Sequence, residues 1–221
     1  IVAGHVGENK GQANHFAFAL LSRHDTDWDL GYSNVEVSAT SPDAVAGFGR
    51  VRQRVVEYWA GGTWSHRVRE GLSFGVSPFV AYRAQRSRRS LTLEDLAAGT
   101  SRAVFVAKES EYNHVRLLAK AGIAWRPGRW EIGATVTTTG MRVYDAGKSV
   151  FNASVAGGPS PPILSASTQK GLDATYRAPW SVAGGATWRG RRTAIHTSVE
   201  WFSAVDPYDI LTPDPAPVAG S

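Results

Sequence analysis

The stretch Trp125-Arg126-Pro127-Gly128-Arg129-Trp130 joins two segments in which apolar and polar side chains alternate. The apolar residues hold the odd positions over 113–125 and the even positions over 129–140. Such alternation is typical of a strand with one apolar face, and a Pro-Gly pair marks a tight turn. This part of the sequence therefore predicts an antiparallel hairpin with a tryptophan on each side of its turn.

Two further copies of this signature occur, at Trp64–Gly71 and at Trp188–Arg192. Tryptophan beside short turns, with longer connections between the hairpins, is typical of a transmembrane β-barrel. We therefore expect the turns near 67–70, 126–128 and 189–191 to lie at one end of a sheet. The polar segments 24–47, 88–104 and 145–167 are predicted to be loops at the other end.

The composition of the 221-residue chain excludes several classes of protein. It contains no apolar run of about 18 residues, which a membrane helix requires. It contains no cysteine, which excludes disulfide scaffolds and thiolate chemistry. Its net charge is +5, but the one dense basic run lies at the end of a predicted strand, so we expect no nucleic-acid partner. Ile1–Gly4 has no signal-peptide pattern, which we interpret as a processed or internal start.

The periodicity predicts about seven antiparallel strands of roughly 12 to 20 residues, longer than is usual in soluble proteins. Residues 170–189 keep one parity and are predicted to form a single kinked strand, whereas the parity changes near Met141, where a bulge is expected. The predicted fold is all-β, an antiparallel transmembrane β-barrel over residues 1–211 followed by a Pro/Ala-rich tail at 212–221. Because bacterial single-chain barrels have even strand numbers, we interpret the chain as part of a larger barrel.

The apolar parity defines the predicted lipid-facing belt, with tryptophans at the membrane interface. The belt residues are Tyr58, Leu72, Phe74, Val76, Leu117, Ile123, Ile132, Val182, Ile195 and Val199, and the interface residues are Trp64, Trp125, Trp130 and Trp188. The alternative is a soluble antiparallel barrel or sandwich that binds a ligand, in which the same faces would form a core. Tryptophans at one depth favour the lipid interpretation.

The opposite parity carries polar residues of both signs, which argues against a simple ion-selective pore. These candidate lumen residues are Glu57, Arg83, Gln85, His114, Arg116, Lys120, Glu131, Asp173, Arg177, His196 and Glu200. The alternative for any of them is a merely wetted sheet face. Glu57 is predicted to lie opposite Ala81 and diagonal to Arg83, close enough for an ion pair.

Three apolar residues break the parity and are predicted to point inward, namely Val55, Trp59 and Phe79. They are candidates for an apolar ligand pocket, or for contacts with an internal plug. No catalytic constellation is present, so we expect no enzyme activity and no cofactor. Asp25–Gly31 together with Glu36 has the acidic spacing of a calcium loop, but its glycine is one position late, and a solvated acidic loop without metal is favoured.

The segment Tyr176–Arg189, its tight turn and Ala194–Phe202 resemble the late strands of the FadL-like outer-membrane transport proteins, and Ser73–Phe79 is similar to the family as well. The resemblance extends over about 50–205. It implies a fourteen-stranded barrel with an N-terminal plug, in contact with membrane lipid and lipopolysaccharide in the bacterial outer membrane. It also implies transport of hydrophobic small molecules such as long-chain fatty acids or aromatic hydrocarbons. The alternative is a general porin or structural outer-membrane protein. The family's N-terminal Asn-Pro-Ala is not found in this sequence.

Overall fold

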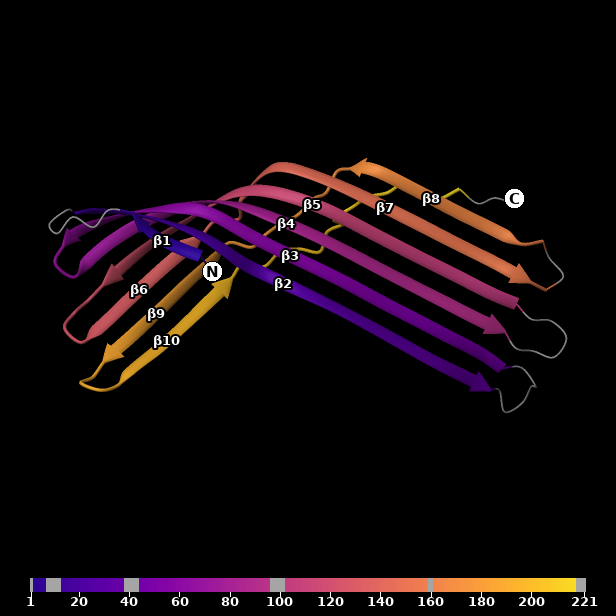
Figure 1. Ribbon diagram of the computed structural model, residues 1–221, viewed down its shortest axis with the longest axis horizontal. Coiled ribbons are helices and arrows are strands. Elements are labelled where there is room, and N and C mark those ends of the chain that lie inside the picture. The colour runs from indigo at the N-terminus through magenta and orange to yellow at the C-terminus, as the bar shows by residue number, and fades with distance from the viewer. Residues whose placement is uncertain (1, 7–12, 38–43, 96–101, 159–160, 218–221) are drawn as a thin grey trace.

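Antiparallel strands form one sheet that is curled into a half-barrel in the computed structural model (Figure 1). The structure describes residues 2–6, 13–37, 44–95, 102–158 and 161–217. The described residues contain no helix long and apolar enough to cross a membrane. The all-β antiparallel prediction is confirmed.

Ten strands make up the sheet within the described residues, where about seven were expected. They are β1 (Val2–Val6), β2 (Asn14–Val37), β3 (Ala44–Arg69), β4 (Leu72–Asp95), β5 (Arg102–Trp125), β6 (Trp130–Thr137), β7 (Met141–Gly157), β8 (Ile163–Leu172), β9 (Ser181–Arg189) and β10 (Ala194–Phe202). Strands β2 to β5 have 24 to 26 residues each, which is longer than predicted.

The sheet divides at β5. Strands β1 to β5 follow one another in order, and then the last part of β5 pairs with β6 while its first part pairs with β7. Strand β8 continues from β7, and β9 and β10 continue from β6 (Figure 1). The two branches therefore share β5 as their common neighbour.

Two interruptions produce this division. Residues 138–140, which include Gly140 at a φ of 88°, separate β6 from β7, so the expected irregularity near Met141 is confirmed. The single kinked strand predicted over 170–189 is wrong, because Leu172 ends β8 and Ser181 begins β9. Between them Thr175 N donates to the carbonyl of Ile210, outside the sheet. Periodicity alone could not reveal this, because β8 and β9 keep the parity but pair with different strands.

The predicted long loops are wrong for most of their length. Strand β2 continues to Val37, β4 to Asp95 and β7 to Gly157. Polar residues are compatible with a strand here because opposite charges on the outer face pair across strands, such as Arg50 with Asp29 and Arg52 with Asp27. The acidic segment that resembles a calcium loop is thus part of β2.

The predicted placement of the tight turns is confirmed. Leu72 lies opposite Trp125 and Trp130 opposite Trp188, so the three turns lie at one end of the sheet. Gly157 lies opposite Arg102, at the other end of β5. The last residues of β2, β4 and β7 therefore lie at the end of the sheet that is far from the tight turns (Figure 1).

The apolar parity lies on the outer face of the sheet. Of the ten predicted belt residues, nine are exposed, with Val199 at 72% and Ile195 at 60%, while Leu72 is half-buried. All described strands belong to this one sheet, so no second sheet covers the belt. The core that a soluble sandwich would build from these faces is not observed in the described part of the chain.

Aromatic residues border this outer apolar belt on both sides. Trp125, Trp130 and Trp188 follow each other on neighbouring strands at the turn end, and Trp64 shares their face; we call these four the tryptophan row. On the far side Tyr58 lies opposite Tyr82, and Val115 separates Tyr82 from Tyr144; we call these three tyrosines the tyrosine row. The first row was predicted and the second was not.

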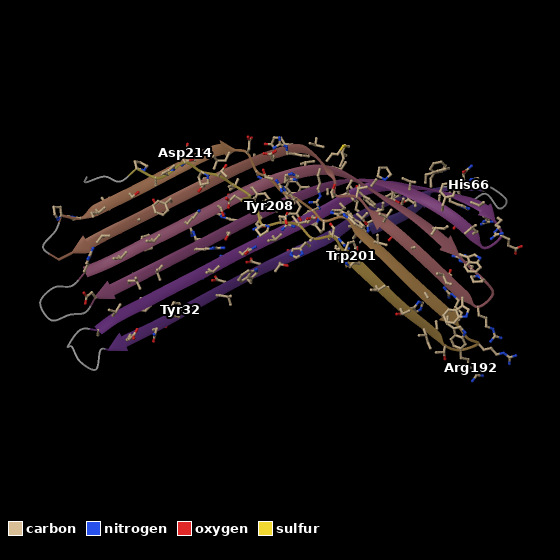
Figure 2. The ribbon with its side chains drawn as sticks, turned by 180° about the vertical axis from the view of Figure 1, so that it is seen from behind. Tyr32, His66, Arg192, Trp201, Tyr208 and Asp214 are labelled. Atoms are coloured by element: carbon tan, nitrogen blue, oxygen red, sulfur yellow. The ribbon has the colours of Figure 1, made fainter. Side chains whose placement is uncertain are left out.

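The chain after β10 returns along the inner face, where Tyr208 and Asp214 are labelled in Figure 2. The side chain of Gln169 donates to the Asp214 carbonyl at 2.9 Å and accepts from its N–H at 2.9 Å. Ser165 Oγ donates to the Pro217 carbonyl at 2.7 Å. The Pro/Ala-rich residues, as far as Pro217, therefore lie in extended form against β8.

Candidate functional site

The centre of the inner face is the carboxylate of Glu57 on β3. Its Oε1 accepts from Trp59 Nε1 at 2.6 Å and from Arg116 Nη2 at 2.7 Å, and its Oε2 accepts from Arg83 Nη1 at 2.9 Å. Glu57 and Arg116 are each only 4% exposed. One buried carboxylate therefore faces two guanidinium groups, which leaves the cluster with an excess positive charge.

The Glu57–Arg83 ion pair was predicted and is confirmed, although its register differs. Arg83 lies directly opposite Glu57, and Ala81 lies opposite Trp59, two residues from the expected position. The difference arises because the turn lies at Glu70–Gly71, later in the chain than the centre predicted within 67–70, and the irregularity between Arg67 and Arg69 offsets it by only one residue. The hairpin is therefore not centred as its sequence alone suggested.

A second set of hydrogen bonds fixes Arg83. Its Nε donates to Tyr112 Oη at 3.1 Å, its Nη2 donates to Gln85 Oε1 at 3.2 Å, and Tyr112 Oη donates to the same Gln85 oxygen at 3.0 Å. Each of the three guanidinium nitrogens of Arg83 thus donates to one side chain, so this guanidinium is held in place. It serves as a support for Glu57.

Arg116 differs because part of its guanidinium is unused. Its Nε and Nη1 are buried and have no hydrogen-bond partner, and both ring nitrogens of the neighbouring His114 are in the same state. Tyr176 lies over both arginines, with its ring centroid 4.7 Å from the Arg116 carbon Cζ and 4.5 Å from that of Arg83. Buried N–H donors without partners are costly, so this place favours an acceptor supplied by a ligand or by water.

An apolar wall adjoins the charged cluster. Trp59 and Phe79 lie with their ring centroids 5.6 Å apart, and together with Ala81 and Leu118 they form the buried apolar cluster of the chain's described part. A Cβ on Gly61 would collide with the Pro78 carbonyl oxygen and the Phe79 ring, so glycine is required for this close approach. The inward orientation predicted for Trp59 and Phe79 is confirmed.

A cavity of about 330 Å³ lies between these two parts. Its lining includes Arg23, Glu57, Trp59, Arg83, Arg116, Leu118, Thr137, Tyr176, Pro179, Ser181 and Phe202. Lys120 Nζ and Arg23 Cζ each lie over the Trp59 ring, at 5.5 Å and 5.4 Å from its centroid. The cavity therefore combines aromatic surface with several cations and one carboxylate.

The other predicted lumen residues divide into two groups. Lys120 and Glu200 lie at the margin of the site, where Glu200 accepts a hydrogen bond from Ser181 Oγ at 2.8 Å. Val55 is buried on the inner face but lies outside the apolar cluster. Glu131 instead pairs with Arg126 and Arg189 near the turns, and His196 is hydrogen-bonded to Thr187 on exposed strands. Arg177 is exposed and lies over Tyr208, because residues 173–180 leave the sheet.

Sequence reasoning missed three residues of the site. Tyr176 has the outer parity of its segment, but the interruption between β8 and β9 turns it inward. Tyr112 shares the parity of His114 and Arg116, which would have revealed it had the strand been extended toward its true start. Arg23 lies at the irregularity of β2 between Ser22 and His24; its parity is that of the polar face, but it was not predicted as a lumen residue.

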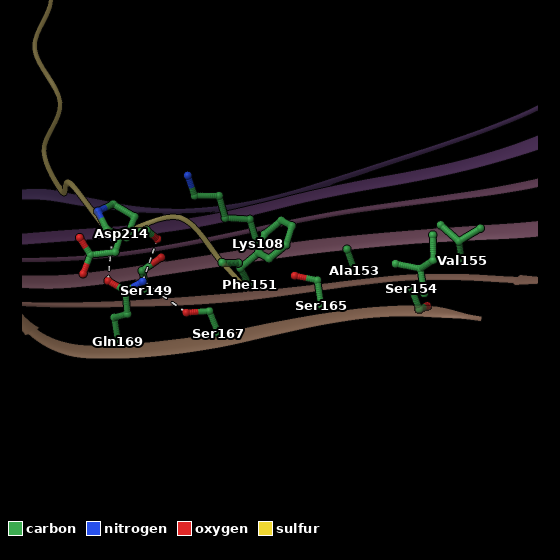
Figure 3. Close-up of a pocket in the computed structure, with 13 residues that line it drawn as sticks. Lys108, Ser149, Phe151, Ala153, Ser154, Val155, Ser165, Ser167, Gln169 and Asp214 are labelled. Carbon is green, nitrogen blue, oxygen red and sulfur yellow. Dashed lines mark hydrogen bonds between the residues drawn. The ribbon is translucent and has the colours of Figure 1, made fainter. Parts of the chain in front are cut away.

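A larger cavity, of about 490 Å³, lies farther from the turns between the inner face of β7 and β8 and the C-terminal segment (Figure 3). Phe151, Ala153, Val155 and Pro213 supply apolar surface, and Lys108 supplies a cation. Gln169 joins this wall to Asp214 by the hydrogen bonds described above. A neighbouring inner-face cavity of about 410 Å³ is lined mainly by polar residues such as Gln53, Gln85 and Arg89, so this side of the inner face offers both apolar and polar space.

The chemistry available at the Glu57 cluster is binding. Unused donors on Arg116 suit a carboxylate or hydroxyl acceptor, and Trp59 with Phe79 suits an apolar body. Within the described ranges, no group of three or more His, Asp or Glu residues is placed to hold a metal ion. No family model, curated protein or solved structure significantly matches the chain.

Proposed function

We propose that this chain is part of the wall of an outer-membrane β-barrel that transports hydrophobic small molecules, favouring those with an acidic group, such as long-chain fatty acids. The observation that carries the proposal is the buried Arg116, whose Nε and Nη1 have no partner beside the Trp59–Phe79 wall. An amphiphilic acid would place its carboxylate on Arg116 and its apolar part on the aromatic wall.

The outer face supports the membrane placement. Along β5 the distance from Val115, at the tyrosine row, to Trp125 is ten residues, or about 33 Å of strand. Tilted by about 45°, such a segment spans about 24 Å, close to the height of the apolar band of outer-membrane barrels. Exposed apolar side chains bordered by aromatic residues are expected for a surface in contact with lipid and are unusual for a soluble domain.

The edges of the sheet support closure by further strands. All nine residues of β10 are exposed, and β1 pairs with only five residues of β2. Long unpaired edges are an aggregation hazard, and barrels remove them by closing. The resemblance to the FadL-like family suggests fourteen strands in the closed wall, of which the described sheet would supply the eight that lie side by side from β1 to β10.

Uptake measurements test the proposed cargo. Cells or proteoliposomes carrying the full-length protein are offered a long-chain fatty acid and, separately, an aromatic hydrocarbon. Replacing Trp59 and Phe79 by Ser should lower the uptake of both, because the apolar wall is lost. Arg116→Gln should lower the uptake of the acid more than that of the hydrocarbon.

Arg69→Gln is the matched control, because Arg69 is an exposed arginine at the turn end of β3 and lies outside the cavity. Assembly of every variant is checked by its heat-dependent mobility on gels. Unchanged uptake in the three site variants would refute the proposal. If small sugars also passed freely, the general-porin alternative would hold instead.

A further inference from the structure

Four arginines form a square on the outer face, beyond the tyrosine row. Arg54 of β3 lies opposite Arg86 of β4, and Arg52 lies opposite Arg88. Alternate residues of a strand point to the same face, so all four share the face of Tyr58 and Tyr82. We call Arg52, Arg54, Arg86 and Arg88 the arginine square.

The square is only partly neutralised. Arg52 pairs with Asp27 at 3.4 Å, and Arg86 and Arg88 share the single carboxylate of Glu109. No ion pair joins Arg54 to another residue in the described ranges, although Asp27 lies opposite Arg54 on β2 and Glu111 lies opposite Arg86 on β5. Like charges directly opposite each other in a sheet are destabilising, so the arrangement favours an additional anion.

The guanidinium groups are accessible to such an anion. The side chains of Arg52, Arg86 and Arg88 are 58%, 60% and 66% exposed. They face away from the inner surface of the sheet, so a cargo molecule at the Glu57 cluster cannot reach them. The anion must come from outside the wall.

The nearer pair of the square, Arg54 and Arg86, lies close to the outer limit of a headgroup layer, and Arg52 with Arg88 lies two residues farther out. Arg54 lies four residues beyond Tyr58, about 13 Å along the strand and about 9 Å along the membrane normal if the strand is tilted by about 45°. The polar headgroup layer extends about 5 to 8 Å beyond the hydrocarbon core on each side. Long arginine side chains can bend toward that layer, as snorkelling residues do.

We infer that the arginine square binds the phosphate groups of a glycolipid headgroup whose acyl chains lie along the outer belt. The inference rests on the membrane placement proposed above. A guanidinium group can bind a phosphate through two parallel N–H donors. The two directly opposed arginine pairs therefore offer two places where a phosphate can be held in this way. The square lies on the side away from the tight turns, which in bacterial barrels is the external side.

The test uses the full-length protein assembled in phosphatidylcholine nanodiscs, with diphosphoryl lipid A and its dephosphorylated form as probes. Arg54→Gln/Arg86→Gln should weaken binding of the phosphorylated probe by about tenfold or more and leave binding of the other unchanged. Arg69→Gln/Arg129→Gln is the control, because it removes two exposed turn arginines and the same charge. Arg54→Lys/Arg86→Lys should give an intermediate loss, since lysine keeps the charge without the fork.

Three outcomes would overturn the inference. The first is equal binding of the two probes. The second is an equal loss of binding in the turn control, which would indicate general charge attraction. The third is displacement of the phosphorylated probe by millimolar inorganic phosphate, which would indicate a site for free anions. Failure of the wild type to assemble in any lipid would refute the membrane placement itself. Normal assembly without phosphate preference would refute the arginine square alone.

Discussion

Glu57→Gln should destabilise the protein more than any single exposed substitution. The wild-type carboxylate accepts hydrogen bonds from Trp59, Arg83 and Arg116, and the side chains of the two arginines are only 16% and 5% exposed. The amide keeps the shape but removes the charge, so two buried guanidinium groups face each other without compensation. Breaking a buried ion pair in this way costs about 3 to 5 kcal/mol of the free energy of unfolding.

The assay is urea unfolding of the protein in lipid vesicles, followed by tryptophan fluorescence. Asp27→Asn is the matched control, because its partner Arg52 is exposed, and it should show a far smaller loss. The double variant Glu57→Gln/Arg116→Met should recover part of the loss, because it removes one of the uncompensated charges. A loss below about 1 kcal/mol for Glu57→Gln would refute the reasoning that the cluster is a tightly coupled buried network.

Three further predictions concern packing, lipid contact and pH. Gly61→Ala should lower uptake of the apolar cargo by displacing Phe79. Gly62→Ala is the control and should leave uptake unchanged, because its Cβ would meet only the Ala17 carbonyl oxygen, at 3.7 Å. Equal uptake by the two variants would contradict the displacement of Phe79. Val136→Arg on the outer belt should cost about 2 to 4 kcal/mol of stability in vesicles if it lies near mid-bilayer, whereas Thr168→Arg on β8 should be tolerated. Burial raises the pKa of Glu109, but hydrogen bonds and charges of Arg86 and Arg88 outweigh this and hold that pKa below its usual value. The Glu109 carboxylate therefore contributes its full stabilisation above the pKa that it has in the unfolded chain, and this stabilisation is lost as the pH falls through its pKa in the folded protein. Glu109→Gln should accordingly lower the free energy of unfolding, measured with urea, at pH 7 but not at about pH 2.

Local patterns predicted the parts of the fold that depend on one strand at a time. The alternation placed Ile123 and Ile132 on the outer face, and the parity exceptions Trp59 and Phe79 on the inner face. The repeated tryptophan turns predicted which connections share an end of the sheet. These features follow from the two-residue period of strands, which needs no knowledge of partners.

The rest depends on partners distant in sequence. The segment around Asp29 was predicted to be a loop because of its acidic residues, although Trp28, Leu30 and Tyr32 alternate with them. It forms a strand whose charges pair across the sheet, as Asp29 does with Arg50. Tyr176 turned inward because β8 and β9 choose different neighbours, which no local pattern encodes. The exact register of Glu57 depended on the turn at Glu70–Gly71 and on an irregularity beside it, where one extra residue shifts every later pair.

The division of the sheet at β5 constrains the order in which the protein can fold. Pairing Thr137 of β6 with Ser181 of β9 closes a loop of more than forty residues, and that loop contains the whole β7–β8 hairpin. If the hairpin forms first, only residues 138–140 and 173–180 remain as free chain, which lowers the loop-closure cost by about 1 kcal/mol. Strand β10 in turn can be added only after β9, its sole partner in the described sheet. Hydrogen exchange during refolding should therefore protect the amides of Val150 and Phe151 before those of Val182 and Ala183.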